Sequence, residues 1–419
     1  MSATDAEAVS STRRAAETPQ EQAATALDRL DEELVALRRD LHAHPEPSWE
    51  EHRTTALVFE RLSAAGLSPT VAAPGTGVVC DVGNGGPLVA IRGDIDALRL
   101  ADTKDVSYRS TVDGICHACG HDLHTVATLG AGLALHDVLG EVNLPGRVRL
   151  VFQPAEEAVP GGAAALVAAG VMDGVEAIFA VHVDPSLPVG EIGIAAGPIT
   201  SAADQLDITL RGPGGHTARP HQTTDLAHVA ARVVVDLPAS LHRLSDPRDG
   251  LNLTFGSIQV GDAANVIANE ARLLGSLRSS GRGAWEAAPP LIRRLLAAIA
   301  EPLGATWELD HRVGAPPIMN DPWAVEVAAR AAAAVVGPEG VRPTVQSSGG
   351  EDFAWYGEST PVGYVRLGVW APGAPRVDIH AGRFDLDERA IGIGARLLAT
   401  TAIEALIDLA PGSPCLAPS

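Results

Sequence analysis

Lysine is nearly absent from this chain of 419 residues, in which Lys104 is the only one. This absence excludes a phosphate-binding Gly-Lys-Ser/Thr loop and a kinase lysine, and it leaves a Schiff base only to Lys104. Aromatic residues make up 4% of the chain against 46% hydrophobic residues overall, so the core must consist mainly of Ala, Val, Leu and Ile. Any chemistry therefore has to come from carboxylates, His, Cys, Ser or Arg.

Basic charge is also scarce, because 31 Lys and Arg stand against 52 Asp and Glu, which gives a net charge of −21. This balance argues against nucleic acid and anionic membranes as partners, since both attract a basic face. Four cysteines are too few for a disulfide scaffold in a chain of this length. Residues 1–25 resemble a mobile polar leader without the apolar segment of a signal peptide, and no long uncharged apolar run predicts a membrane span. We expect a cytoplasmic protein.

Short apolar strands alternate with helices in two parts of the chain, residues 26–199 and 314–410. The first helix carries leucines at helical spacing and should end before Pro45. This alternation predicts an α/β domain with a largely parallel sheet that helices cover on both faces, followed by a tail at 411–419. Strands are expected at 78–82, 88–95, 148–152, 177–183, 191–195 and 364–367, and further helices at 50–66, 121–139, 162–169 and 387–409.

Residues 200–313 follow a different order. Strands are expected at 205–210, 251–260, 271–277 and 306–313, and helices at 225–244, with a bend at Pro238, and at 286–300. The order βαββαβ is that of a small ferredoxin-like two-layer sandwich. The simplest architecture is therefore a small domain inserted into the larger one.

The densest group of reactive side chains is Cys-His-Ala-Cys-Gly-His-Asp-Leu-His, which begins at Cys116. Cys116 and Cys119 could form a redox pair or half of a zinc site, but Cys80 and Cys415 are isolated and argue against a four-Cys zinc. Cys119 and His121 could instead be two metal ligands on a turn before a helix, whose N-terminus favours a thiolate. A purely structural role for buried Cys and His also stays open.

Carboxylates and histidines follow other expected strands. Glu156 and Glu157 come just after the strand at 148–152, at the strand end where α/β sheets place their sites. A metal held by one, with the other as a base on water, would keep both ionised, although a solvated turn also fits. Asp96 suits a metal site or the orientation of a histidine, and equally a turn. Considered singly, three histidines could be either functional or ordinary core and loop residues: His182, His216 and His380.

Together and in this order, the motifs resemble the di-metal amidohydrolases of the aminoacylase/carboxypeptidase superfamily, in particular the N-acyl-amino-acid, hippurate and indole-acetyl-amino-acid hydrolases. The resemblance covers residues 34–409. The matching segments are His-Ala-His-Pro-Glu from His42, Gly-Asp-Ile-Asp-Ala-Leu from Gly93, Cys-Gly-His-Asp from Cys119, Gln-Pro-Ala-Glu-Glu from Gln153, Val-His-Val from Val181, Gly-His-Thr-Ala-Arg-Pro-His from Gly215, Asn-Val-Ile from Asn265 and Gly-Glu-Asp-Phe from Gly350.

The resemblance implies a catalytic domain with two divalent metal ions, Mn²⁺ or Zn²⁺ with Co²⁺ and Ni²⁺ as alternatives. It also implies an inserted lid domain that forms a homodimer. Glu156 becomes the general acid/base, Asp96 the carboxylate that orients a ligand, and His216 an oxyanion stabiliser that reaches the partner subunit's site. The implied metal ligands are Cys119, His121, Glu157, His182 and His380, and the implied substrate-binding residues are Asn265 and Arg278.

The implied activity is hydrolysis of the amide bond of a small N-acyl-amino acid. The two metals share and acidify a water that attacks the amide carbon, while Glu156 takes the proton and passes it to the leaving amine. A metallo-dipeptidase and an aminobenzoyl-glutamate-type hydrolase are alternatives on the same scaffold, and a thiol–disulfide enzyme that uses Cys116 and Cys119 is an alternative of another class. Three residues depart from the usual motifs without removing a ligand, and they bear on loop rigidity and specificity: Pro47, Arg99 and Ala268.

Overall fold

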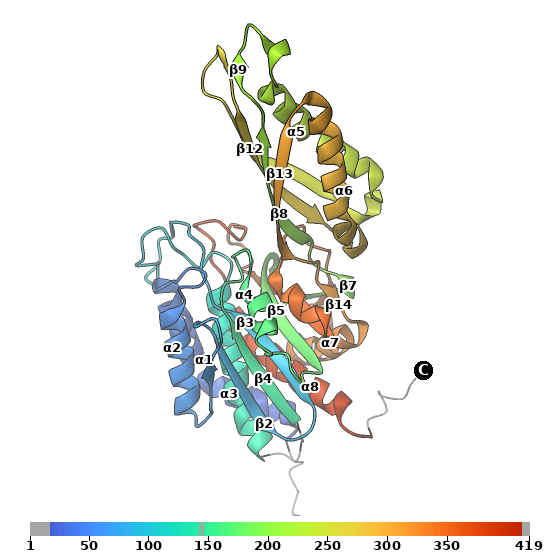
Figure 1. Cartoon of the computed structure of the whole chain (residues 1–419). Coiled ribbons are helices and arrows are strands. Elements are labelled where there is room, and N and C mark those ends of the chain that lie inside the picture. The colour runs from blue at the N-terminus through green and yellow to red at the C-terminus, as the bar shows by residue number, and fades with distance from the viewer. Residues whose placement is uncertain (1–16, 142–143, 145, 413–419) are drawn as a thin grey trace, which may run out of the picture.

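The computed structural model describes residues 17–141, 144 and 146–412, and Figure 1 shows two bodies of unequal size. The larger body is built around an eight-stranded sheet, and the smaller body, drawn above it, around a four-stranded sheet. The chain enters the smaller body after residue 201 and returns to the larger one after residue 315. The predicted α/β class is confirmed.

The eight-stranded sheet has the order β1-β2-β4-β3-β5-β16-β6-β15. Its central strands β4, β3, β5 and β16 run parallel to one another, whereas β2 pairs antiparallel with β4 on one side and β6 pairs antiparallel with β16 on the other. The sheet is therefore mixed with a parallel centre. The strands are β1 (Thr70–Val71), β2 (Val78–Asn84), β3 (Leu88–Asp94), β4 (Gly146–Gln153), β5 (Ala177–Pro188), β6 (Ile192–Ile194), β15 (Val341–Pro343) and β16 (Val362–Trp370).

Helices cover both faces of this sheet, which explains why β3 is buried along its whole length. Val89 and Ile91 of β3 pack into one core with α1 (Pro19–Ala43), α3 (His121–Glu141), α7 (Pro322–Val336) and α8 (Arg389–Leu409). Leu88 and Ala90 point the other way, into a second core with α4 (Gly162–Ala168) and the 3-10 segment η5 (Asp352–Glu358). A strand buried on both faces is mainly apolar, as the Leu-Val-Ala-Ile run of residues 88–91 is, and the buried Arg92 and Asp94 at its end need polar partners. Helix α2 (His52–Ala64) and the short pair β7 (Gly197–Pro198) and β14 (Met319–Asn320) complete the larger body.

Helix α1 begins earlier than the sequence suggested. Thr18 accepts a hydrogen bond from the Glu21 backbone N–H, and the Glu21 carboxylate accepts one from the Thr18 N–H, which forms a capping box. The expected leader of residues 1–25 is therefore too long, because its last residues form the first turns of α1, and residues 1–16 lie outside the described part. The helix ends at Ala43, before Pro45 as predicted.

Helix α8 is long and apolar enough to cross a membrane, and it is the single such helix in the described residues. Most of its surface is buried against α1, α3 and α7, so it has the burial of a core helix in this fold. Apolar composition here reflects packing inside the larger body.

The smaller body has the element order β8 (Ala202–Arg211), α5 (Leu226–Leu244), β10 (Asn252–Val260), β12 (Glu270–Ser279), α6 (Arg282–Ala300) and β13 (Thr306–Ala315). Its strands are all antiparallel, in the order β10-β12-β8-β13. Leu206, Ile208 and Leu210 alternate along β8 and pack under α5 and α6 into a core separate from those of the larger body. Helix α5 runs on through Pro238, and α6 begins at Arg282, before the expected residue 286.

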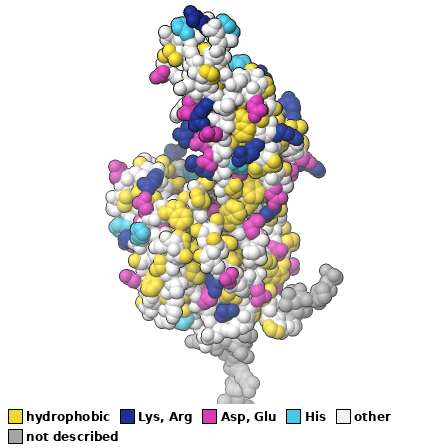
Figure 2. Space-filling model, in the orientation of Figure 1, with side chains coloured by type: hydrophobic (Ala, Val, Ile, Leu, Met, Phe, Trp, Pro, Cys, Tyr) yellow, Lys and Arg dark blue, Asp and Glu magenta, His cyan; other side chains and the backbone are white. Residues whose placement is uncertain are grey.

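A two-stranded tip, β9 (Gly215–His216) with β11 (Val266–Ile267), extends from the smaller body at the top of Figure 1. Figure 2 shows acidic and basic side chains intermixed over the visible face of this body. Surface ion pairs such as Arg272 with Asp207 and Arg211 with Glu308 account for part of this mixture.

Candidate metal centre and active site

The carboxyl ends of three neighbouring parallel strands meet at one edge of the large sheet. Strand β3 ends at Asp94, β4 leads to Glu156 and Glu157, and β5 carries His182. The N-terminus of α3 adds His121 at the same edge. This edge lines a cavity of about 530 Å³, whose other wall comes from the smaller body. Topology thus places acidic and imidazole groups where α/β sheets form their sites.

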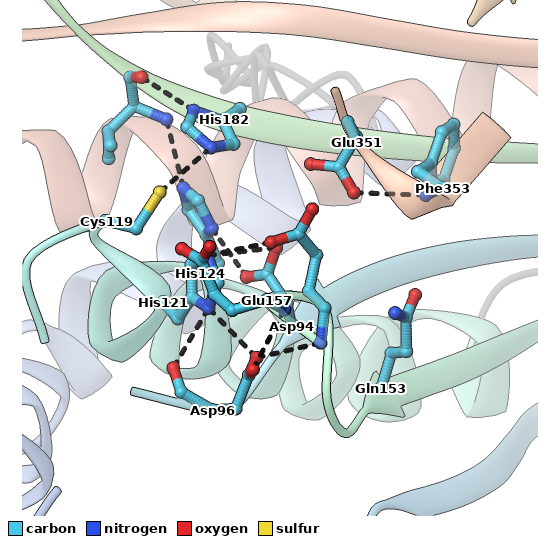
Figure 3. Close-up of polar contacts among 12 residues, drawn as sticks. Asp94, Asp96, Cys119, His121, His124, Gln153, Glu157, His182, Glu351 and Phe353 are labelled. Carbon is cyan, nitrogen blue, oxygen red and sulfur yellow. Dashed lines mark hydrogen bonds and ion pairs between the residues drawn. The ribbon is translucent and has the colours of Figure 1, made fainter. Parts of the chain in front are cut away.

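Cys119 lies at the centre of two overlapping groups of donor atoms. One group joins its sulfur to His121 and His182, and the other joins it to Glu157 and His380, with all ligand atoms of each group within 4.8 Å of one another. The Cys119 sulfur is 3.5 Å from His182 Nε2 (Figure 3). A shared thiolate between two donor sets is an arrangement that can hold two adjacent divalent ions.

In the two histidines of the first group, Nδ1 contacts the backbone and Nε2 is the atom left to face the other donors. His121 Nδ1 lies 2.9 Å from the Asp96 backbone oxygen, and His182 Nδ1 lies 2.8 Å from the Val183 backbone oxygen. A carbonyl oxygen only accepts, so in both rings Nδ1 donates its proton to the backbone, and Nε2 is the atom that a metal can bind in place of a proton. His121 Nε2 is buried without a hydrogen-bond partner among the described residues. A buried imidazole nitrogen without a protein partner fits the role of a metal ligand.

The raised pKa values of His380 and His121 show that anionic side chains surround the two donor groups. His380 Nε2 lies 3.1 Å from Glu157 Oε1, and hydrogen bonds to Cys119 and Glu157 raise the pKa of His380 to about 10. Burial alone would lower the pKa of His121, yet Asp94 and Cys119 raise it well above its usual value. Two imidazoles that bind protons this readily report an excess of anionic donors. The donor set therefore fits divalent cations.

Asp96 fixes the turn that carries the two glutamates. Its carboxylate accepts the backbone N–H of Glu156 at 3.1 Å and that of Glu157 at 3.0 Å, and it also accepts the Ser48 hydroxyl at 2.7 Å. The same carboxylate lies 3.2 Å from His121 Nδ1. Burial opposes ionisation, but these hydrogen bonds, that of His121 foremost, lower the pKa of Asp96. One buried carboxylate thus orients a ligand histidine and both glutamates.

Glu156 is the acidic side chain of this turn that faces other carboxylates. Burial and the neighbouring Glu351 and Glu157 raise the pKa of Glu156 well above its usual value. Its Oε2 lies 3.9 Å from His121 Nε2, beside the centre. A carboxyl group with a raised pKa can bind and release a proton near neutral pH, which is the property that a general acid/base needs.

Behind the centre lies a buried arginine that we did not predict. Arg92 is 1% exposed and donates to Asp94 at 2.6 Å and to Glu351 at 2.9 Å. Asp94 in turn lies 2.6 Å from His124 Nδ1, while His124 Nε2 accepts the Val183 N–H at 3.0 Å. With both nitrogens engaged, His124 has no lone pair for a metal. Arg92 and His124 are therefore supports of the site, and Figure 3 shows His124 with the ligands beside Asp94.

The Gly-Glu-Asp-Phe motif at residues 350–353 adds Glu351 and Asp352 to this hydrogen-bond network. Glu351 also accepts the Tyr364 hydroxyl at 2.8 Å, and Asp352 accepts Gln153 Nε2 at 2.7 Å. Burial raises the pKa of Asp352 to about 8, in spite of the opposing effect of Arg92. The polar network thus ties η5 to the ends of β3 and β4.

Two glycines permit the close packing around the centre. Gly120, between Cys119 and His121, has φ of +83°, and a Cβ there would lie 2.6 Å from a Val183 methyl carbon. A Cβ on Gly350 would lie 2.4 Å from the Ala203 Cβ. Any other side chain would strain the backbone at the first position and would force the two bodies apart at the second.

The structure brings most of the predicted site residues together, with two exceptions. Arg278 of β12 lines the cavity with Glu156 and four of the five expected ligands, and the fifth, His121, lies next to Cys119 and His182. His216 and Asn265 lie instead on the β9–β11 tip, where the Thr217 N–H donates to the Asn265 backbone oxygen at 3.3 Å. Within one chain they do not line this cavity, so their expected role stays a prediction.

The side chains that could carry other chemistry are engaged elsewhere. Lys104 is buried, with its Nζ 3.1 Å from Asp102, and it does not line the cavity. Cys116 is a free, buried thiol whose pKa burial raises to about 11. A redox cysteine needs a low pKa, so this environment disfavours the thiol–disulfide alternative. Arg99, one of the three departures, pairs with Glu50 at the surface.

Comparison with known proteins points to one family. Residues 90–404 match the peptidase family M20/M25/M40. The chain is 36% identical over 373 residues to N-acetylcysteine deacetylase of Bacillus subtilis, which covers 88% of this chain and 96% of that protein. The chain is also 46% identical over 378 residues to a Rhodococcus jostii protein named putative glutamate–cysteine ligase 2-3. This match covers 90% of the present chain but only 47% of the length of the Rhodococcus protein.

A solved structure agrees with this assignment. The crystal structure of the Bacillus subtilis YXEP protein, described as a dinuclear metal-binding peptidase of the M20 family, matches with a TM-score of 0.77 and 33% identity. It covers 90% of this chain and 99% of that one. The shared fold, the match over most of the chain and the donor set at the strand ends lead to one conclusion. The chain belongs to the peptidase family M20/M25/M40 and is a hydrolase of amide bonds.

Proposed function

We propose that this protein releases an amino acid from a small N-acyl-amino acid by metal-dependent hydrolysis. The observation that carries the proposal is the pair of donor groups that share Cys119, with Glu156 beside them in the same cavity. The names of relatives support the acyl substrate, since one is an N-acetylcysteine deacetylase and another, 36% identical over 296 residues, an N-acyl-L-amino acid amidohydrolase of Geobacillus stearothermophilus.

Two divalent ions, one with Cys119, His121 and His182 and one with Cys119, Glu157 and His380, would supply Lewis-acid activation of water and of the amide carbonyl. The carboxylate of Glu156 takes a proton from the attacking water. Glu156 then returns that proton to the amide nitrogen, so that the leaving group departs as a neutral amine.

The surrounding residues hold the geometry of this exchange. Asp96 fixes the backbone of Glu156 and the tautomer of His121 through the hydrogen bonds described above. Arg278 lies across the cavity from the ligands and is a candidate for holding the substrate's carbonyl or carboxylate. We assign Mn²⁺ or Zn²⁺ as the expected ions, because a donor set of Cys, His and carboxylate suits both transition metals and less well Mg²⁺ or Ca²⁺.

The proposal is tested with purified protein and a set of N-acetyl-L-amino acids. Treatment with a chelator, followed by its removal, should abolish release of the free amino acid, and Mn²⁺, Zn²⁺ or Co²⁺ should restore it. Full hydrolysis by protein whose metal content is near zero would contradict the proposal. A panel of dipeptides with free α-amino groups, assayed beside the acetylated substrates, tests the dipeptidase alternative, which predicts the opposite preference.

We further propose that the protein is a homodimer through the smaller body. His216 and Asn265 lie at the β9–β11 tip and do not line their own chain's cavity, which supports a role at the site of a second copy. The exposed Val266 beside them is an apolar residue that a partner could cover. Sedimentation at micromolar concentration should give twice the mass of 43.2 kDa, and mixing inactive His216→Ala and Glu156→Gln chains should restore part of the activity if the tip acts in the partner's site.

A further inference from the structure

The cavity contains a second arginine that neither the sequence motifs nor the proposed chemistry uses. Arg366 lies in the middle of β16, directly opposite His182 of β5 in the strand register. It lines the same cavity as Glu156 and four of the five expected ligands: Cys119, Glu157, His182 and His380. Its side chain is therefore held by the rigid centre of the sheet, next to a residue of the metal centre.

Arg366 is buried but has almost no partners. It is 9% exposed, and its recorded side-chain hydrogen bond is one of 3.4 Å from Nη2 to the Ile199 backbone oxygen. The guanidinium also lies 5.3 Å from the centre of the Tyr364 ring. Within the described residues it makes no ion pair, whereas the other deeply buried arginines, Arg38 and Arg92, both pair with carboxylates.

An unpaired buried guanidinium is costly, so its retention calls for an anion that the chain itself does not supply. The planar fork of N–H groups matches a carboxylate with two parallel hydrogen bonds. The carboxylates of the cavity, Glu156, Glu157 and Glu351, would repel an anionic substrate. The cavity's arginines, Arg278 and Arg366, are the groups that can offset this repulsion, and Arg366 is the one that pairs with His182 in the strand register.

We propose that Arg366 is a specificity-determining residue that binds a carboxylate of the substrate, so that the enzyme selects acyl-amino acids with a carboxylate close to the scissile amide. This inference rests on the proposed function. The carboxylate has two possible sources, the α-carboxylate of the released amino acid or a carboxylate on the acyl group, and the substrates below separate them.

The test compares three substrates with metal-loaded protein: N-acetyl-L-leucine, its neutral analogue N-acetyl-L-leucinamide, and N-succinyl-isobutylamine, which has a carboxylate on the acyl side alone. Losing charge-assisted hydrogen bonds should cut kcat/KM roughly 10- to 150-fold for the recognised substrate in Arg366→Gln and less in Arg366→Lys. A loss confined to N-acetyl-L-leucine assigns the α-carboxylate, and one confined to the succinyl compound assigns the acyl carboxylate. Arg293→Gln, an exposed arginine of α6, is the matched control and should leave all three rates unchanged.

Two results would overturn the inference: equal losses on all three substrates, or no loss on either carboxylate substrate. Metal content should be the same in wild type and Arg366→Gln, which separates substrate binding from damage to the centre. If wild type hydrolyses none of the three compounds, the proposed function has failed, and calorimetry then decides the inference separately. Binding of N-acetyl-L-leucine or the succinyl compound that weakens in Arg366→Gln supports it, and binding that does not depend on the substituted residue contradicts it.

Discussion

Replacing Arg92 by methionine tests whether the buried polar network holds the metal centre in place. Arg92 is 1% exposed and pairs with the carboxylates of Asp94 at 2.6 Å and Glu351 at 2.9 Å. Methionine fills part of the volume but leaves these carboxylates buried without their cation. Breaking a buried ion pair on one side costs about 3–5 kcal/mol, so we expect the free energy of unfolding at pH 7 to fall by about this amount.

The loss should depend on pH in a defined direction. In the wild type, burial would raise the pKa of Asp94, but Arg92 first and then His121 and His124 hold it well below its usual value. A depressed pKa contributes stability that is present above the unfolded pKa of about 3.9 and is lost as the pH falls through the folded value. Without Arg92 the pKa of Asp94 rises. The variant can then take up a proton on Asp94 as the pH falls, which removes the uncompensated buried charge. The difference between variant and wild type should therefore be smaller at pH 5 than at pH 7.

The measurement is urea unfolding followed by circular dichroism, with metal removed from both proteins so that ligand binding does not mask the change. Arg342→Met is the matched control, because Arg342 is 45% exposed and pairs with Glu191 at the surface. Such a pair contributes about 0–1 kcal/mol. A loss for Arg92→Met no larger than that of the control, or one equal at both pH values, would refute the reasoning.

Two further predictions concern the turn before α3. Cys119→Ser should lose most of the bound metal and the activity, whereas Cys116→Ser should keep both, because the Cys116 thiol lies outside the two donor groups. Metal analysis and activity assays of both variants check this. Equal losses in the two variants would favour the thiol–disulfide alternative. Gly120→Ala should destabilise the protein by about 1–3 kcal/mol and lower its metal content, because the residue has φ of +83° and its Cβ would meet Val183. Gly140→Ala, with open space around it in α3, should instead be neutral or stabilising, and thermal melts compare the two.

The sequence revealed the metal-ligand candidates because each lies in a short motif, some after an apolar strand, Cys119 and His121 before a helix, and His380 in a loop. Cys119 and His121 share one turn, and Glu156 and Glu157 are adjacent, so local order made them candidates, and the family resemblance of the ordered motifs then implied their roles. Parallel strands then had to bring their carboxyl ends together, which is a general property of such sheets. Apolar runs likewise indicated the positions of several strands, as residues 88–91 do for β3.

The supporting network could not be found in this way, because its members are distant in the chain. Arg92 and Glu351 are 259 positions apart and meet only in the folded structure. Arg366 lies inside an apolar strand, where a single charged residue gives no local signal of what it faces. The start of α1 was missed because the polar composition of residues 1–25 indicated a leader, whereas Thr18 and Glu21 form a capping box in the structure.

The central claim is that Glu156 transfers the proton while other residues hold the metals, and the Glu156→Gln variant tests it most directly. Glutamine keeps the size of the side chain and removes the titratable group. We predict that turnover of the best N-acyl-amino acid falls by at least about 100-fold, in line with the usual contribution of a general acid/base. The metal-to-protein ratio should stay at the wild-type value. Near wild-type turnover in this variant with full metal content would contradict the account.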